Sequence, residues 1–227
     1  MDIRESQQSR RLPVYILADT SGSMSAEPIV AVNQGLQLLK SELENEPRAV
    51  QTVWISLISF GGQARVEVPL TELMAFNPPT LGAGGGTPLG EALRLLNQSI
   101  DADVILTTGK GSGDYKPLVF IFTDGEPTDD WRSAAQEVKQ RARARTANII
   151  AVGCGPQVND ATLKELTESA IHMDDTSAGS FQKLIQWMSQ SVKHVSIKPP
   201  AGAPGAAAPA TTTLPPLPAN SGFTVVY

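Results

Sequence analysis

Short, continuously apolar runs alternate with longer amphipathic stretches along most of this chain, and this alternation constrains the fold more than any other feature. A strand that is buried on both faces reads as a continuous apolar run, whereas apolar residues three and four positions apart mark one face of a helix. Strands that alternate with helices form a parallel sheet with helices on both of its faces. The sequence therefore predicts the α/β class, with a doubly wound, mostly parallel sheet.

The expected elements follow from these two patterns. Strands are expected at residues 14–19, 52–60, 118–123, 148–152 and 170–173, and helices at 25–46, 130–146 and 160–168, with two more that begin near Thr87 and Ser180. Ser25 and Thr87 are each expected to cap the helix that follows. Gly61-Gly62 reads as a turn into a short strand over residues 64–69. This hairpin predicts one antiparallel edge strand in a sheet of about six strands.

Length and charge limit the classes of function. With 227 residues the chain is long enough for one sizeable core, and its net charge of −5 provides no field that favours nucleic acid or an anionic membrane. No apolar run approaches the ~20 residues that span a bilayer, and the N-terminus lacks the apolar core of a secretory signal. We therefore expect a cytoplasmic protein with no nucleic-acid or membrane partner. Cys154 is the only cysteine, which excludes an intramolecular disulfide and a cysteine-based zinc site.

Composition changes abruptly near residue 198, after which the chain is rich in proline and alanine and carries no charged residue. The expected organisation is a polar N-terminal segment over residues 1–11, one domain over 12–198 and a Pro/Ala-rich tail over 199–227. Residues 199–221 are expected to form an extended spacer. Residues 223–227 are β-prone, and they are proposed to dock as a short strand on a sheet edge or in an apolar groove, with a disordered end of the chain as the alternative.

Side chains with oxygen donors stand where the expected strands end or helices begin. In an open α/β sheet, the carboxyl ends of the strands are where ligands bind. Carboxylate and hydroxyl oxygens are hard ligands, which suit Mg²⁺, Mn²⁺ or Ca²⁺ and do not suit zinc or copper. The sequence therefore predicts a divalent-cation site. Its candidate ligands are Asp19, Ser21, Ser23, Thr87 and Asp124.

Three motifs carry a family resemblance: Asp19-Thr20-Ser21-Gly22-Ser23, the Gly-flanked Thr87, and Thr123-Asp124-Gly125. In this order they resemble the metal-ion-dependent adhesion site of von Willebrand factor A domains, and the similarity covers about residues 11–195. The resemblance implies that one divalent cation is coordinated directly or through water, Mg²⁺ in the first place and Mn²⁺ or Ca²⁺ as alternatives. It also implies a protein partner whose Asp or Glu fills an open coordination position. The ligands that it implies are Asp19, Ser21, Ser23, Thr87 and Asp124.

Within that family, residues 18–24, 85–90 and 122–129 look most like the bacterial TerY group of tellurium-resistance-associated A domains. The resemblance to this group implies a cytoplasmic adaptor. Its partners would be a protein kinase and a PP2C-type phosphatase.

Two other interpretations of the same residues remain. Ser21, Ser23 and Thr87 can each cap a helix, and Asp124 can start a turn, although capping and metal ligation are compatible. The chain can also be a Mg²⁺-dependent hydrolase that uses the same strand ends. A phosphatase of the haloacid-dehalogenase type needs a second acid where Ser21 stands, so its general acid/base would be missing. We therefore expect a binding module and not an enzyme.

Acidic residues follow the last of these motifs closely: Glu126, Asp129 and Asp130. An incoming carboxylate would be repelled by such a rim. The rim therefore favours a partner whose acidic ligand is flanked by basic residues, which would also steer the encounter in a salt-dependent way.

Overall fold

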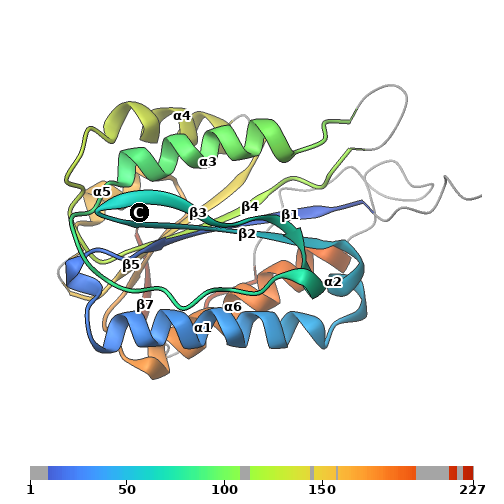
Figure 1. Cartoon of the computed structure of the whole chain (residues 1–227), viewed down its shortest axis with the longest axis horizontal. Helices are drawn as coiled ribbons and strands as arrows, with labels where there is room; N and C mark the ends of the chain where they lie inside the picture. The colour runs from blue at the N-terminus through green and yellow to red at the C-terminus, as the bar shows by residue number, and fades with distance from the viewer. Residues whose placement is uncertain are drawn as a thin grey trace, which may run out of the picture.

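The computed structural model describes residues 10–107, 113–143, 146–156, 158–197, 215–218 and 222–226. Over these residues the chain forms one seven-stranded sheet in the order β3-β2-β1-β4-β5-β6-β7, covered by helices (Figure 1). The strands are β1 (Leu12–Asp19), β2 (Val53–Gly61), β3 (Gln63–Glu72), β4 (Leu118–Thr123), β5 (Asn148–Cys154), β6 (Ala170–Met173) and β7 (Phe223–Val226). The helices are α1 (Glu27–Glu44), α2 (Pro47–Thr52), α3 (Leu89–Asp103), α4 (Arg132–Arg143), α5 (Asp160–Leu166) and α6 (Ala178–Ile197).

The sheet has the predicted topology. β1 pairs in parallel with β2 on one side and with β4 on the other, and β4, β5 and β6 continue the parallel part. β3 runs antiparallel to β2 at one edge, as the hairpin prediction requires. The doubly wound, mostly parallel sheet is therefore confirmed. Because the chain goes from β1 to β2 on one side and returns to β4 on the other, the carboxyl ends of β1 and β4 form a topological switch point.

The tail adds a seventh strand, so the expected count of about six strands with a single antiparallel edge was too low. β7 pairs antiparallel with β6 at the opposite edge from β3. Val226 is buried against the core on one face of the sheet, and Phe223 packs against the core on the other. The predicted strand at the end of the chain is confirmed for Phe223–Val226, while Tyr227 lies outside the described residues.

Another described part of the tail also contacts the domain. Nε1 of Trp187 donates a hydrogen bond of 3.0 Å to the carbonyl oxygen of Pro215, and Leu217 packs against the core. The rest of the expected spacer lies outside the described residues, as does the expected N-terminal segment apart from Arg10 and Arg11. The domain boundaries drawn from composition stay a prediction.

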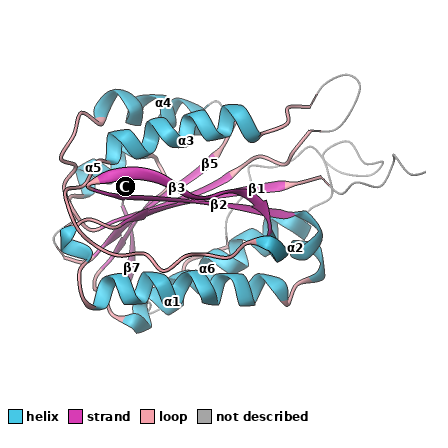
Figure 2. Ribbon diagram, in the orientation of Figure 1, coloured by secondary structure: helices cyan, strands magenta, loops and turns pink. Residues whose placement is uncertain are grey.

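The core has two layers, one on each face of the sheet. Val14 and Ile16 of β1 point into the layer under α1 and α6, whereas Tyr15 and Leu17 point into the layer under α3 and α4. Figure 2 shows these two helix pairs on opposite faces. Every residue of β1 is buried, as expected for a strand that is covered on both sides.

Two expected helix caps do not form. The Ser25 hydroxyl donates to the carbonyl oxygen of Gly22, and α1 begins at Glu27 without a side-chain cap. α3 begins at Leu89, and the Thr87 side chain makes no cap bond to it. Both hydroxyl residues lie in loops that pack on each other, so their positions are set by those contacts and not by the helix ends.

The helix expected over residues 25–46 is α1, and a short helix that was not expected, α2, follows it. α1 ends at Glu44, and Pro47 begins α2, where a proline is tolerated because the first helical residue needs no N–H donor.

Among all the helices of the described ranges, none is long and apolar enough to cross a membrane.

Candidate metal centre

The oxygen ligands predicted from the sequence lie at the carboxyl ends of β1 and β4, at the left of Figure 1 where the chain passes from β1 into α1. Asp19 is the last residue of β1, and Asp124 follows the last residue of β4. Ala18 is in register with Phe122, so Asp19 stands level with Thr123. Two neighbouring parallel strands thus bring both carboxylates to the same edge of the sheet.

Both oxygens of the Asp19 carboxylate are held by hydrogen bonds. The backbone N–H of Ser21 donates to Oδ1 at 2.8 Å, and the Thr123 hydroxyl donates to Oδ2 at 2.7 Å. Asp19 is fully buried. The carboxylate is therefore fixed in orientation before any ligand binds. Sequence reasoning missed Thr123 as a positioning residue, although it is part of the Thr-Asp-Gly motif.

Two hydroxyl groups bridge the space between the carboxylates. The Ser21 and Ser23 hydroxyls are 3.0 Å apart, and the Ser23 hydroxyl donates to Oδ1 of Asp124 at 2.7 Å. The loop after β1 thus points both hydroxyls toward the carboxylate that follows β4. Four of the five predicted ligands form one continuous polar cluster.

Thr87 completes the predicted set. It is buried, and its hydroxyl makes no hydrogen bond with any described residue. Its side chain faces the same space, because a Cβ atom at Gly125 would lie 3.5 Å from Oγ1 of Thr87 and 3.6 Å from Oγ of Ser23. Backbone hydrogen bonds of Thr87 to Thr128 hold it there. Among the described residues, the only enclosed side-chain polar atom without a partner is Nδ2 of Asn148, so the Thr87 oxygen is open to solvent and available to an external ligand.

Burial of the Asp19 and Asp124 carboxylates is electrostatically unfavourable as long as no positive charge balances them. Desolvation raises the pKa of Asp19 above its usual range, against the hydrogen bonds from Ser21 and Thr123. Desolvation also raises the pKa of Asp124, opposed by the hydrogen bond from Ser23 and reinforced by the charge of Asp19. A divalent cation between the two carboxylates would remove both costs.

The donor set fits a hard cation. The described residues contain no group of three or more His, Cys, Asp or Glu side chains suited to a metal. A cation at this place would therefore depend on two carboxylates together with three hydroxyls and water. An oxygen-only set of this kind suits Mg²⁺, Mn²⁺ or Ca²⁺. Metal binding by the five side chains stays a prediction, but the side chains themselves share one site.

Backbone contacts hold the glycine loop before Thr87 against the loop after β1. The N–H of Gly22 donates to the carbonyl of Gly85 at 2.9 Å, and the N–H of Gly84 donates to the carbonyl of Thr20 at 2.8 Å. Gly85 has a positive φ of 78°, and a Cβ atom there would lie 2.6 Å from Cα of Gly62. Close backbone approach therefore explains why the loop needs glycine at position 85.

Asp129 has a structural task that the sequence did not reveal. Its two carboxylate oxygens accept hydrogen bonds of 2.9 Å from the backbone N–H groups of Gly90 and Glu91, in the first turn of α3. Asp129 thus caps α3 in place of Thr87. Of the expected acidic rim, only Glu126 and Asp130 are exposed.

We expect Asp129→Ala to lower the free energy of unfolding by about 1–2 kcal/mol, the usual cost of losing a cap. Urea unfolding of the chelated protein measures this loss. Asp130→Ala, one residue further along the same loop, should change stability by less than about 0.5 kcal/mol because its side chain is exposed. Equal effects of the two substitutions would contradict the capping role.

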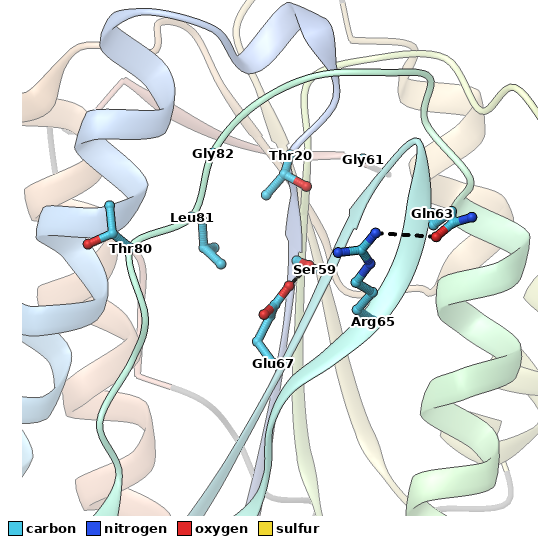
Figure 3. A pocket seen from close by; sticks show the side chains of 9 residues that line it. All are labelled: Thr20, Ser59, Gly61, Gln63, Arg65, Glu67, Thr80, Leu81 and Gly82. Atoms are coloured by element: carbon cyan, nitrogen blue, oxygen red, sulfur yellow. Dashed lines mark hydrogen bonds between the residues drawn. The ribbon is translucent and has the colours of Figure 1, made fainter.

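A polar cleft of about 210 Å³ opens beside the candidate metal centre (Figure 3). It lies between the β2–β3 hairpin and the loop that leads to α3. Thr20, which stands between two predicted ligands in the chain, is part of its wall. No sequence pattern indicated this cleft. Its lining residues are Thr20, Ser59, Gly61, Gln63, Arg65, Glu67, Thr80, Leu81 and Gly82.

Comparison with known proteins agrees with this geometry. The model of the von Willebrand factor type A domain family matches residues 14–187. No curated protein matches the chain in sequence.

Solved structures share the fold at low sequence identity. The pilus adhesin SpaC from Lactobacillus rhamnosus GG, in its open conformation, has a TM-score of 0.64 and 16% identity, over 83% of this chain and 30% of the adhesin. A von Willebrand factor type A protein from Catenulispora acidiphila has a TM-score of 0.59 and 16% identity, over 82% and 43% of the two chains. Proximal thread matrix protein 1 from the mussel byssus, solved with a zinc-occupied MIDAS motif, has a TM-score of 0.55 and 16% identity, over 81% and 48%. The chain thus spans less than half the length of each of these proteins.

Proposed function

Because this chain belongs to the von Willebrand factor type A domain family, as the match over residues 14–187 establishes, we propose that it is a metal-dependent protein-binding module. The proposed ligands of the divalent cation are Asp19, Ser21, Ser23, Thr87 and Asp124. The observation that carries the proposal is the convergence of the hydrogen-bonded cluster from Asp19 to Asp124 with the Thr87 hydroxyl, which has no internal hydrogen bond and lies near Ser23 across Gly125. The zinc-occupied MIDAS motif of the mussel protein supports a cation at this position.

We propose Mg²⁺ as the resident ion, because two carboxylates and neutral hydroxyls form a hard, weakly charged ligand set. When it is bound, the cation supplies an open position that accepts a carboxylate from outside. The chain's own residues would orient the two acidic ligands, because Ser21 N–H and the Thr123 hydroxyl hold Asp19 and the Ser23 hydroxyl holds Asp124. The proposed partner is a protein that presents an Asp or Glu side chain.

At a finer level, we propose a cytoplasmic adaptor of the TerY type that works with a protein kinase and a PP2C-type phosphatase. This level rests on the motif resemblance alone. Binding is favoured over hydrolysis because Ser21 stands where a phosphatase of the haloacid-dehalogenase type needs an acid. His172 lies in β6, where its Nδ1 is 2.7 Å from Oδ1 of Asp160, and it is not part of the ligand cluster. A generic aryl phosphate assay with Mg²⁺ tests the hydrolase alternative.

The proposal predicts metal-dependent capture of a partner. Proteins retained by the immobilised full chain in Mg²⁺ should be lost with chelator and should not be retained by Asp19→Ala. One Mn²⁺ per chain should bind in isothermal titration, and Asp19→Ala should bind none. Retention that persists both in chelator and in Asp19→Ala would overturn the proposal.

A further inference from the structure

The polar cleft beside the metal centre contains an unpaired carboxylate. Glu67, on the edge strand β3, is half-buried, and its Oε1 accepts a hydrogen bond of 2.6 Å from the Ser59 hydroxyl. No cation pairs with Glu67 among the described residues. Partly buried charges are normally paired, because desolvation without a partner is unfavourable. Glu67 therefore has the capacity to bind a cation from outside the chain.

A second group in the cleft is also without a partner. Thr20 is only 6% exposed, and its hydroxyl makes no hydrogen bond with any described residue. Figure 3 shows Thr20 under the loop that carries Gly82, above Ser59 and Glu67. The cleft thus contains a carboxylate without a cation and a hydroxyl without a hydrogen bond, and both line a solvent-accessible space where an external polar ligand can reach them.

Arg65 is not the cationic partner of Glu67, although both side chains line the cleft. Its guanidinium donates to Oε1 of Gln63 at 3.3 Å, and its side chain is exposed at the mouth of the cleft. Figure 3 shows this bond as a dashed line, directed away from Glu67. Arg65 makes no ion pair with Glu67 within the described chain. The inner part of the cleft thus has an acceptor and a hydroxyl, while the positive charge is at the rim.

The size and position of the cleft define what it can hold. Its volume of about 210 Å³ equals about seven waters, which is room for one long side chain. Thr20 is bonded in the chain to both Asp19 and Ser21, so one residue of the cleft wall lies between two proposed metal ligands, although none of the five ligands lines the cleft itself. This proximity is what allows one partner to present a side chain to each place.

We propose that this cleft binds a basic side chain, Lys or Arg, of the partner whose carboxylate binds the metal, with Glu67 and the Thr20 hydroxyl as its acceptors. This inference rests on the proposed function, because it places the two side chains on one partner. The exposed Glu126 and Asp130, in the loop that follows β4 and Asp124, add negative charge near the metal centre that favours a basic neighbour. The partner is thus recognised by one acidic and one basic side chain that lie close together.

The cleft is tested without metal, so that its failure is separate from that of the metal centre. Methylguanidinium chloride is titrated into the ¹⁵N-labelled full chain in chelator, with sodium chloride and sodium acetate at matched ionic strength as controls. We expect saturable amide shifts at Thr20, Ser59 and Glu67 with methylguanidinium alone. Absence of such shifts, or their appearance with acetate in its place, would overturn the proposal.

Two substitutions of neighbouring charges should act in opposite directions. Glu67→Gln keeps an acceptor for Ser59 but removes the charge, and it should weaken methylguanidinium binding by about tenfold. Arg65→Gln removes a repulsive charge at the rim and should strengthen binding by about threefold. If Glu67→Gln folds, as its amide spectrum reports, and binds as wild type does, the assignment of the cleft is wrong. Loss of methylguanidinium binding in Arg65→Gln would also contradict the proposal, because removal of a neighbouring positive charge should not weaken a cation site.

A metal titration on the same samples separates the two proposals. Glu67→Gln should bind Mn²⁺ as wild type does. Asp124→Asn should lose Mn²⁺ binding but keep the methylguanidinium shifts. If Mn²⁺ fails to bind wild type while methylguanidinium binds, the cleft stands and the metal-dependent function falls.

Discussion

At a Mg²⁺ or Mn²⁺ concentration about 100 times the dissociation constant, the wild-type chain should gain about 2.7 kcal/mol in free energy of unfolding, and Asp124→Asn should gain almost none. Asparagine has the shape of aspartate and can still accept the 2.7 Å hydrogen bond from the Ser23 hydroxyl. The substitution therefore removes one of two metal-binding charges with little change in packing. Thermal or urea unfolding over a metal titration measures the gain.

In chelator the same substitution should leave the protein as stable as wild type, or more stable. Desolvation raises the pKa of Asp124 above its unfolded value. A carboxyl group whose pKa is raised by folding favours the protonated state, so its charge lowers the free energy of unfolding at neutral pH. Asparagine carries no charge and removes that cost. A residue that served only to hold the loop would instead lose stability in chelator.

Asp130→Asn is the matched control for charge. Its side chain is exposed on the same loop, and the substitution removes the same formal charge. It should therefore keep the full metal response. If both substitutions reduce the response equally, the ion acts through general electrostatics. If neither reduces it, Asp124 is not a ligand.

The ligand cluster could be predicted because its members are set by local patterns. Asp19 and Asp124 each follow a continuous apolar run, and the carboxyl ends of parallel strands meet at one edge of the sheet. The same logic placed the edge hairpin, since Gly61-Gly62 is a local turn signal. When the residues of a site stand at the ends of neighbouring parallel strands, the pattern of apolar residues in the sequence is enough to predict that they lie together.

The cleft and the cap of α3 could not be predicted in this way, because they depend on contacts between distant segments. Asp129 meets the backbone of Gly90, 39 positions earlier in the chain. In the hairpin, register shifts occur between Ile55 and Ile58, so the alternation of polar residues does not show which face Glu67 occupies. Only the folded hairpin places Glu67 beside Ser59.

Deletion of β7 should be the most destabilising change outside the metal centre. A chain that stops after Pro218 loses the strand that pairs with β6, and with it the burial of Val226 and the packing of Phe223. We expect a loss of about 2–3 kcal/mol, the scale of burying one or two apolar side chains, offset in part by chain entropy. For a protein of this size the melting temperature should fall by about 5–10 °C. The stabilisation by Mg²⁺ should persist, because the ligands lie at β1 and β4.

Two neighbouring valines test whether β7 itself, in the register described, causes this effect. Val226 is 7% exposed and contacts the core, whereas Val225, on the opposite face of the strand, is 38% exposed. Val226→Ala should therefore cost about 2 kcal/mol, and Val225→Ala less than about 0.5 kcal/mol. A larger cost for Val225→Ala than for Val226→Ala would mean that β7 docks with its other face inward, because a slip by one residue exchanges the two faces. An unchanged melting temperature after truncation would mean that β7 contributes nothing to the stability of the domain.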